Sequence, residues 1–183
     1  MNKIIGITGL IGTGKSTLMN LLKKKLNNDF IYIDVDNYRR KLVTEKDDIV
    51  EILNLKNKSD LNRVIYNDKD KMKIFKKYIY DNLLNDFKTD KNIIVEWALL
   101  IDDNLDKYCD YVFIMDCEEE MIINRLKDGD LGIIEIKRRL RLQLPINKKV
   151  KLLSNSNYQV IDTSEEIEIA LIVKKIKEVC YEL

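Results

Sequence analysis

The chain of 183 residues contains no histidine. This absence excludes Ser-His and Cys-His nucleophilic pairs, H-E-x-x-H zinc sites and histidine acid–base catalysis. Any chemistry must therefore use carboxylates, Lys, Arg, backbone amides or a bound metal ion. Transfer of a phosphoryl group is a reaction that these groups support, because positioning and charge neutralisation supply most of its catalysis.

Other residue types are scarce. With one proline, Pro145, and six glycines, no linker, repeat or low-complexity segment marks a boundary, and the length fits a single domain over residues 1–183. The three cysteines, Cys109, Cys117 and Cys180, lack C-x-x-C spacing, so we interpret them as free thiols in a reducing compartment. No apolar stretch approaches membrane-spanning length, and the first residues leave no room for a signal peptide. We therefore expect a cytoplasmic protein.

A strong excess of charge of one sign is also missing. The 32 basic and 31 acidic side chains leave a net charge of +1. Such a balance argues against a protein that binds mainly nucleic acid or an acidic membrane surface. We expect a small-molecule substrate, and a monomer or a small homo-oligomer.

Half of the few glycines lie together in the sequence GLIGTGKS, residues 9–16. This is the complete G-x-x-x-x-G-K-S pattern of a phosphate-binding loop, between an expected strand at 3–8 and an expected helix at 16–26. Glycines let backbone N–H groups curl around an anion, and the helix adds the positive end of its dipole. A strand-to-helix turn that binds nothing is the alternative, which the complete pattern disfavours. The predicted nucleotide-binding residues are Gly9, Ile11, Gly12, Thr13, Gly14, Lys15, Ser16 and Thr17.

Two side chains of this loop have specific predicted roles. Lys15 is expected to reach the terminal phosphates of a nucleoside triphosphate and to act in catalysis. The hydroxyl of Ser16 is expected to hold Mg²⁺. ATP and Mg²⁺ are therefore the expected cofactors.

Apolar runs that are rich in Ile and Val alternate with helical patterns along the chain. Strands are expected at 3–8, 30–34, 92–97, 110–116 and 157–162. Helices are expected at 70–87, around Ile122 and Leu126, around Ile136 and Leu140, and at 165–181 with Ile167, Leu171 and Ile176 on one side. Strands that are apolar on both faces indicate an α/β fold with a mostly parallel five-stranded sheet and helices on both faces. Ligands of such sheets bind at the carboxyl ends of the strands.

Carboxylates follow the strand ends, as this geometry requires. Asp34 and Asp36 come after the second strand; we assign Asp34 to the metal and Asp36 to the substrate hydroxyl, as orienting group or proton acceptor. Alternatively, Asp36 caps a helix that begins near Asn37. Glu96 and Asp102, after the third strand, either face the cleft or are ordinary surface acids. Asp116, after the fourth strand, is more typical of a helix cap.

The segment 125–151 is rich in Arg and Lys and contains Gly129 and Gly132. A helix, a glycine-bearing bend and a basic helix are typical of a lid that closes over ATP and excludes water. We assign Arg125 and Arg139 to nucleotide binding. The alternative is an amphipathic helix with a solvated basic face.

The order of these features resembles the dephospho-coenzyme A kinase family, within the P-loop nucleotide-kinase-like group, over nearly the whole chain. The resemblance rests on IIGITGLIGTGKST, YIDVDNYRRKLV, VEWALLIDDNL, DYVFIMDCEEEMIINRL, Gln143 at the end of the lid helix, and SNSNYQVID. It implies a three-layer P-loop kinase fold with a helical lid at about 125–151 and a helical acceptor-binding region at about 37–90. The implied reaction transfers the γ-phosphate of ATP to the ribose 3′-hydroxyl of dephospho-CoA. Asp36 and Arg40 would then be catalytic.

The chain departs from that family's pattern at several positions. Tyr80-Asp81 stands where His-Pro is usual, Ala98 replaces a proline, and the lid arginine falls near Gly129 or Asp130. Two alternatives therefore stay open. One is a nucleoside or nucleotide kinase of the same fold, with Glu96 in a base-like role; the other is a degenerate ATP-binding protein without efficient turnover.

Overall fold

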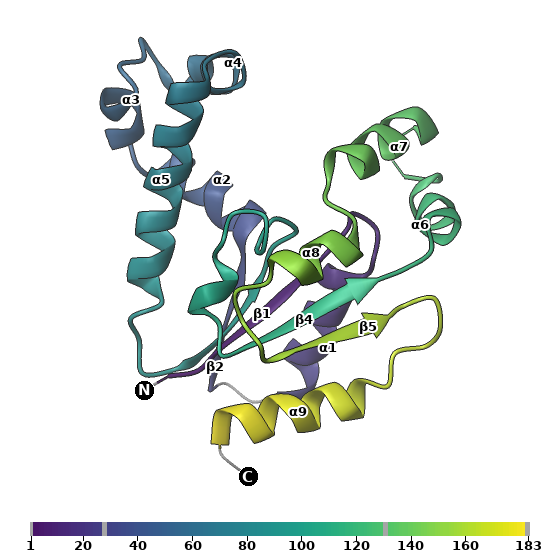
Figure 1. Ribbon diagram of the computed structural model, residues 1–183. Coiled ribbons are helices and arrows are strands. Elements are labelled where there is room, and N and C mark those ends of the chain that lie inside the picture. The colour runs from purple at the N-terminus through teal and green to yellow at the C-terminus, as the bar shows by residue number, and fades with distance from the viewer. Residues whose placement is uncertain (1, 27–28, 130–131, 182–183) are drawn as a thin grey trace. The chain divides into compact units, whose positions relative to one another are not determined.

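Figure 1 shows the computed structural model, which describes residues 2–26, 29–129 and 132–181. A five-stranded sheet in the order β2-β3-β1-β4-β5 forms its centre, and all four strand pairs are parallel. The strands are β1 (Ile4–Gly9), β2 (Phe30–Asp34), β3 (Asn92–Glu96), β4 (Tyr111–Asp116) and β5 (Tyr158–Asp162). The prediction of a parallel five-stranded sheet is confirmed.

The inner strands are apolar on both faces because both faces are covered. Ile93, Ile94 and Val95 of β3 are fully buried, as are Ile5 and Ile7 of β1. Such continuous β-branched runs are typical of parallel sheets, whose crossover segments shield both sides. The same runs made the strands recognisable in the sequence.

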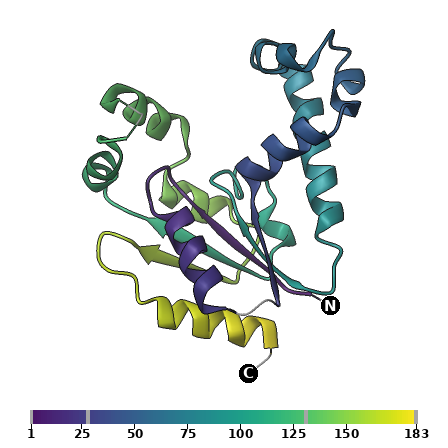
Figure 2. The same ribbon diagram turned by 180° about the vertical axis from the view of Figure 1, so that it is seen from behind.

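Two helices cover one face of the sheet, α1 (Lys15–Lys25) and α9 (Ile169–Tyr181) (Figure 2). Leu18 and Leu22 of α1 pack with Ile172 and Ile176 of α9 in the main hydrophobic core. Full burial of each such side chain contributes about 1.5–3 kcal/mol relative to exposure. The phosphate-loop helix is thus anchored to the sheet by its apolar side, which leaves its first turn for other contacts.

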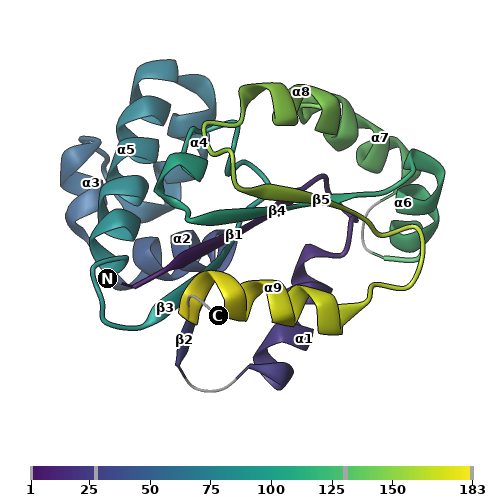
Figure 3. The same cartoon turned by 60° about the horizontal axis from the view of Figure 1, so that its bottom comes forward.

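The opposite face lies under α8 (Ile146–Leu152) and the segment 97–109, which includes a short 3₁₀ turn at Asp106–Tyr108 (Figure 3). Leu100, Ile101 and Leu105 of that segment are buried. Leu100 comes so close to Gly6 that a Cβ at residue 6 would lie 2.6 Å from its Cδ2. After β4 the chain forms α6 (Glu119–Leu126) and α7 (Ile133–Leu142).

Residues 35–89 form a second compact unit, whereas residues 1–34 and 90–183 form the first. The second unit contains α2 (Val35–Glu45), α3 (Asp48–Ile52), a 3₁₀ turn at Lys58–Asp60, α4 (Leu61–Asn67) and α5 (Lys69–Asp86). It has its own core, formed by Leu42, Ile49, Leu53, Leu61, Ile65, Phe75, Tyr78 and Ile79. Its proposed role in binding the acceptor stays a prediction.

Hydrogen bonds from two tyrosines fasten the helices within this second unit. The hydroxyl of Tyr38 on α2 donates to Asp86 at 2.7 Å, and that of Tyr78 on α5 donates to Asp48. Burial and these carboxylates raise the pKa of both phenols above the usual value. Both hydroxyls therefore stay protonated at neutral pH and remain hydrogen-bond donors.

Three sequence expectations about local structure are wrong. Helix α2 begins at Val35 rather than near Asn37, so Asp36 lies in the first helical turn and does not cap the helix. Helix α9 begins at Ile169, and Leu171 is 59% exposed while Ile172 is buried. Asp116 accepts a hydrogen bond from the next residue at 2.8 Å, and the N-cap position of α6 belongs to Glu118.

Over the described ranges, no helix is both long enough and apolar enough to cross a membrane.

Candidate functional site

The chain between β1 and α1 has the backbone that its glycines predict. The φ angles of Gly12 and Gly14 are 75° and 87°, a left-handed region that side chains with a Cβ rarely adopt. Gly14 occupies the N-cap position of α1 without any side-chain cap. No N-cap side chain therefore occupies the first turn of α1, where the positive end of the helix dipole favours an anion.

The loop also needs glycine because neighbouring atoms lie too close to leave room for a side chain. A Cβ at Gly12 would lie 2.8 Å from side-chain atoms of Ile122 and of Leu126 on α6. A Cβ at Gly9 would lie 2.3 Å from the carbonyl oxygen of Met115 at the end of β4. The loop is therefore packed tightly against the element that starts the lid segment, and glycine is needed there for space as well as for φ.

Lys15 lies across the loop that precedes it. Its Nζ donates to the carbonyl oxygen of Leu10 at 2.8 Å, and the side chain is only 8% exposed. The hydroxyl of Thr13 donates to the same carbonyl at 2.8 Å. The Leu10 carbonyl oxygen thus accepts hydrogen bonds both from the turn of the loop and from the lysine that we assign to the triphosphate.

The hydroxyl of Ser16 donates to Oε2 of Glu96 at 3.2 Å. Glu96 is the buried last residue of β3, and its register partner on β2 is Asp34. A hydroxyl and a carboxylate are therefore in contact at the carboxyl end of β3, beside the start of α1, and Asp34 occupies the neighbouring position at the end of β2. Oxygen donors of this kind suit Mg²⁺, so the residues present fit the ion.

The described part of the chain contains no group of three or more His, Cys, Asp or Glu side chains arranged to hold a metal by themselves. A Mg²⁺ ion at a phosphoryl-transfer site does not need such a group, because one or two protein groups, water and substrate phosphates hold it. Sequence reasoning treated Glu96 only as a weak candidate; its contact with Ser16 joins positions 80 residues apart.

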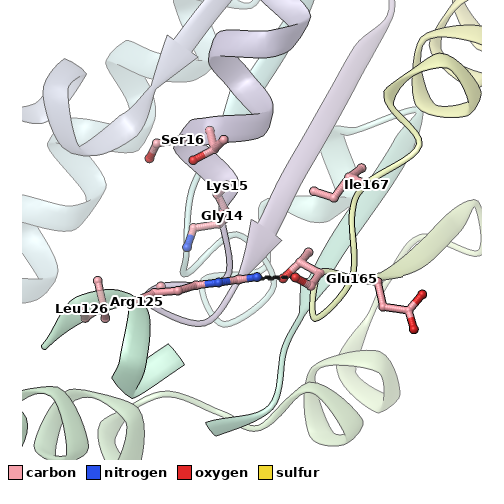
Figure 4. A pocket seen from close by; sticks show the side chains of 10 residues that line it. Gly14, Lys15, Ser16, Arg125, Leu126, Glu165 and Ile167 are labelled. Atoms are coloured by element: carbon pink, nitrogen blue, oxygen red, sulfur yellow. Dashed lines mark hydrogen bonds between the residues drawn. The ribbon is translucent and has the colours of Figure 1, made fainter. Parts of the chain in front are cut away.

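A pocket of about 580 Å³ opens beside the loop (Figure 4). This volume lies within the range of small-molecule and cofactor sites. Its lining combines the loop with α6 and the segment after β5, and consists of Gly12, Gly14, Lys15, Ser16, Thr17, Arg125, Leu126, Thr163, Glu165 and Ile167. Predicted binding residues from the loop and from the lid segment are thus brought together around one cavity.

Arg125 forms one wall of this pocket and is held in place by the segment after β5. Its guanidinium donates to the carbonyl oxygen of Thr163 and to the Thr163 hydroxyl at 3.2 Å (Figure 4). It also donates to the Sγ of Cys117 at 3.4 Å. Thr163 is 2% exposed, and its hydroxyl donates to the carbonyl of Asp116 at 3.0 Å. The sequence did not indicate Thr163, Glu165 or Ile167 as pocket residues, since no motif marks them. They lie beside the pocket because they follow β5, which pairs with β4 in the sheet.

On α7, in contrast to Arg125, the arginines pair with a carboxylate of their own helix. Nε of Arg139 donates to Glu135 at 2.8 Å, and Arg138 makes two hydrogen bonds of 2.6 and 2.8 Å to the same carboxylate. The hydrogen bonds from Arg138 and Arg139 lower the pKa of Glu135 from 4.5 to about 2. Arg139 therefore has a carboxylate partner in this structure, and a phosphate would have to replace it.

Gln143, which ends α7, contacts the phosphate loop directly. Its Oε1 accepts a hydrogen bond of 2.8 Å from the backbone N–H of Ile11. The Ile11 amide, which we predicted to bind nucleotide, is thus engaged by a side chain of the protein. Of the two positions near which the family's lid arginine falls, Gly129 is described and Asp130 lies outside the described residues.

The two proposed catalytic residues of the second unit lie on α2. The Asp36 side chain is 65% exposed and lies 3.9 Å from Arg39. Arg40 donates to the side chain of Asn37 at 2.6 Å and to the Asp36 carbonyl at 3.3 Å. Both side chains are exposed on the first turns of this helix, and their roles stay predictions.

The parallel order of the strands and the glycine loop between β1 and α1 define a P-loop kinase fold. Two solved structures share it: TT1252 from Thermus thermophilus, with a TM-score of 0.73, 21% identity and coverage of 100% of this chain and 98% of that one, and shikimate kinase from Bacteroides thetaiotaomicron, with a TM-score of 0.58, 17% identity and coverage of 99% of each chain.

The family model for dephospho-CoA kinase matches residues 3–167, and the chain belongs to that family of phosphotransferases. A dephospho-CoA kinase from Borreliella burgdorferi is 29% identical to it, over 90% of this chain and 91% of the relative. The enzyme of the same name from Fusobacterium nucleatum is 26% identical, over 90% of this chain and 95% of the relative. The resemblance noted in the sequence motifs is confirmed.

Proposed function

We propose that the protein transfers the γ-phosphate of ATP to the ribose 3′-hydroxyl of dephospho-CoA, the last step of coenzyme A biosynthesis. The observation that carries this proposal is the glycine loop with Lys15 and Ser16, which opens onto a pocket of about 580 Å³ in a chain of the dephospho-CoA kinase family. We place the protein in the cytoplasm, as a monomer or small homo-oligomer.

On the donor side, the amides at the start of α1 and Lys15 hold the β- and γ-phosphates. Lys15 exchanges the Leu10 carbonyl for phosphate oxygens. The planar guanidinium of Arg125, fixed by Thr163, and the apolar Ile167 offer surfaces for the base.

Ser16, with Asp34 and Glu96, would hold Mg²⁺ beside those phosphates. When bound, the ion neutralises charge on the phosphate oxygens. The structural contact of Glu96 with the Ser16 hydroxyl also counts against a nucleoside kinase in which Glu96 acts as the base, because that carboxylate is directed to the metal-binding hydroxyl.

On the acceptor side, Asp36 orients the 3′-hydroxyl and accepts its proton, and Arg40 provides positive charge near the acceptor. The helical unit 35–89 supplies the remaining acceptor contacts. The segment at about 125–151 acts as the lid. Arg139 joins the triphosphate when it leaves Glu135.

An acceptor panel with ADP formation as the readout tests the proposal. We expect dephospho-CoA to stimulate ADP formation at least about 100-fold over the rate without acceptor, and far more than any nucleoside or nucleotide does. Stimulation by a nucleoside instead would favour the second enzyme hypothesis. If no acceptor stimulates ADP formation although ATP binds, the protein is a nucleotide-binding protein without turnover, and the proposal is rejected.

A further inference from the structure

Lys149 belongs to the basic run of the lid segment, yet its side chain is 0% exposed. Its Nζ donates to the carbonyl oxygen of Ala98 at 3.0 Å and to the carboxylate of Asp102. Burial of an ammonium group costs several kcal/mol unless it is paired and hydrogen-bonded, and these two partners offset that cost. Lys149 is therefore an internal anchor of α8 and not part of a basic surface for phosphates.

The Ala98 carbonyl oxygen that binds Lys149 also accepts a hydrogen bond from the strand that leads into the phosphate loop. The buried hydroxyl of Thr8 also donates to the Ala98 carbonyl, at 3.2 Å. Thr8 immediately precedes Gly9, the first residue of the loop pattern. One carbonyl oxygen thus connects α8 with the base of the phosphate loop.

The other end of the same short segment is also attached to the loop. Gln143 accepts the hydrogen bond from the Ile11 amide at 2.8 Å. The segment from Gln143 to Lys149 is consequently fixed at both ends to the frame of the phosphate loop. Helix α7 runs directly into this fixed segment, so its carboxyl end cannot shift without breaking one of these contacts.

Arg139 lies in the last turn of α7, four residues before Gln143, where the helix gives way to extended backbone. We propose that Lys149 is a positioning residue: by anchoring α8, it holds the carboxyl end of α7 against the phosphate loop and thereby delivers Arg139 to the donor phosphates. The role rests on the proposed donor site, and it acts through Arg139 rather than through contact with substrate.

A double-mutant cycle tests this coupling. Lys149→Met keeps the length of the stem and removes the charge. We expect it to lower kcat with dephospho-CoA about 10- to 100-fold and to change the KM of that acceptor less than about threefold, because α7 then loses its position over the donor site. In an Arg139→Ala background, the same substitution should change kcat less than about threefold. An equal fold loss in both backgrounds, or no loss in either, overturns the proposal.

Two further variants keep the test decisive. Lys148→Met removes the neighbouring exposed lysine of α8 and should leave kcat within about twofold of the unmodified protein. If Lys149→Met does not fold, Asp102→Asn replaces it in the cycle, because it weakens the ion pair while the Ala98 hydrogen bond remains.

A failure of the proposed function gives a different result. If the unmodified protein shows no ADP formation with dephospho-CoA, that function is rejected, and the same four proteins are compared by their dissociation constants for MgATP. Positioning through Arg139 predicts that Lys149→Met weakens MgATP binding only when Arg139 is present. Equal weakening in both backgrounds overturns it.

Discussion

Gly12 combines a left-handed φ of 75° with close contact to Ile122 and Leu126. In Gly12→Ala the new Cβ would meet atoms 2.8 Å away, so the loop must move or strain must be absorbed. We expect a loss of about 1–3 kcal/mol in the free energy of unfolding and at least a tenfold weaker affinity for ATP. Chemical denaturation and calorimetric titration measure the two quantities.

The matched control for that substitution is Gly132→Ala. A Cβ on Gly132 would point into open space, with nothing within 4 Å among the described residues beyond its chain neighbours. Gly132 is the N-cap residue of α7, with φ of −64°. The substitution should change stability by no more than about 1 kcal/mol. Equal losses in both variants would mean that the tight packing of the phosphate loop is not what requires glycine.

In the proposed reaction, the acceptor chemistry depends on Asp36. Asp36→Asn keeps the shape of the side chain and removes its capacity to accept a proton. We expect kcat to fall about 10²- to 10⁴-fold, while the dissociation constant of MgATP stays within about twofold. Glu45→Gln, at an exposed carboxylate on the same helix, is the control and should retain activity. Full turnover in Asp36→Asn would remove Asp36 from the mechanism.

The role of a single residue could be predicted from the sequence where a local motif defines it. It could not be predicted where the role depends on contacts between distant parts of the chain. Gly12, Lys15 and Ser16 follow from a local pattern whose spacing is itself the requirement. Lys149 looked like any member of a basic run, and only the contact with Asp102, across 47 positions, reveals an internal ion pair. Thr163 likewise becomes visible only when β4 and β5 pair.

At the scale of the element, the charged side chains of α7 allow a test of whether this helix responds to nucleotide as a lid would. The hydrogen bonds of Arg138 and Arg139 hold the pKa of Glu135 at about 2, below its usual 4.5. The ion pair therefore stabilises the helix above about pH 4.5 and loses that effect as the pH falls towards 2. If Arg139 moves to the triphosphate, MgATP should raise the pKa of Glu135 towards its usual value.

Carboxyl chemical shifts of Glu135, followed by NMR through an acid titration, measure this change. Free protein and protein saturated with a non-hydrolysable ATP analogue are compared over the range in which both stay folded. In Arg139→Ala the analogue should leave the pKa of Glu135 unaltered. An unchanged pKa in the unmodified protein would show that Arg139 does not exchange partners.

The positions of the strands were predicted well, and helix ends less so. Continuous apolar runs mark β3 and β4 because both of their faces are buried. The start of α2 was placed too late, since the helix follows β2 without an intervening turn residue. In α9 we placed Leu171 on the same side as Ile176, whereas packing in the main core buries Ile172 and Ile176 and leaves Leu171 exposed.

At the scale of the whole molecule, nucleotide binding should be visible as stability of the first unit. ATP at 100 times its dissociation constant should stabilise the folded protein by about 2.7 kcal/mol, seen as a rise in the midpoint of thermal unfolding. Lys15→Ala should abolish most of this rise, because the charge that meets the triphosphate is gone. A full rise in that variant would place the nucleotide elsewhere in the molecule.

The fold of the whole chain followed from sequence to a large extent, because one motif and the alternation of strands with helices restrict the topology severely. The sequence indicated where the helical unit 35–89 lies in the chain but not how its helices pack together. Its core joins Leu42 of α2 with Ile79 of α5, which lie far apart in the chain. The helical period predicted the buried side of α5 but not the side chains that pack against it.

The bond between Lys15 and the Leu10 carbonyl has a calorimetric consequence. A triphosphate that recruits this ammonium gains one set of interactions and forfeits an existing one, so the heat released on binding falls short of what the new contacts alone would give. The exchange also sets a threshold: an anion as weakly charged as chloride gains too little to displace the carbonyl, whereas a polyphosphate gains enough.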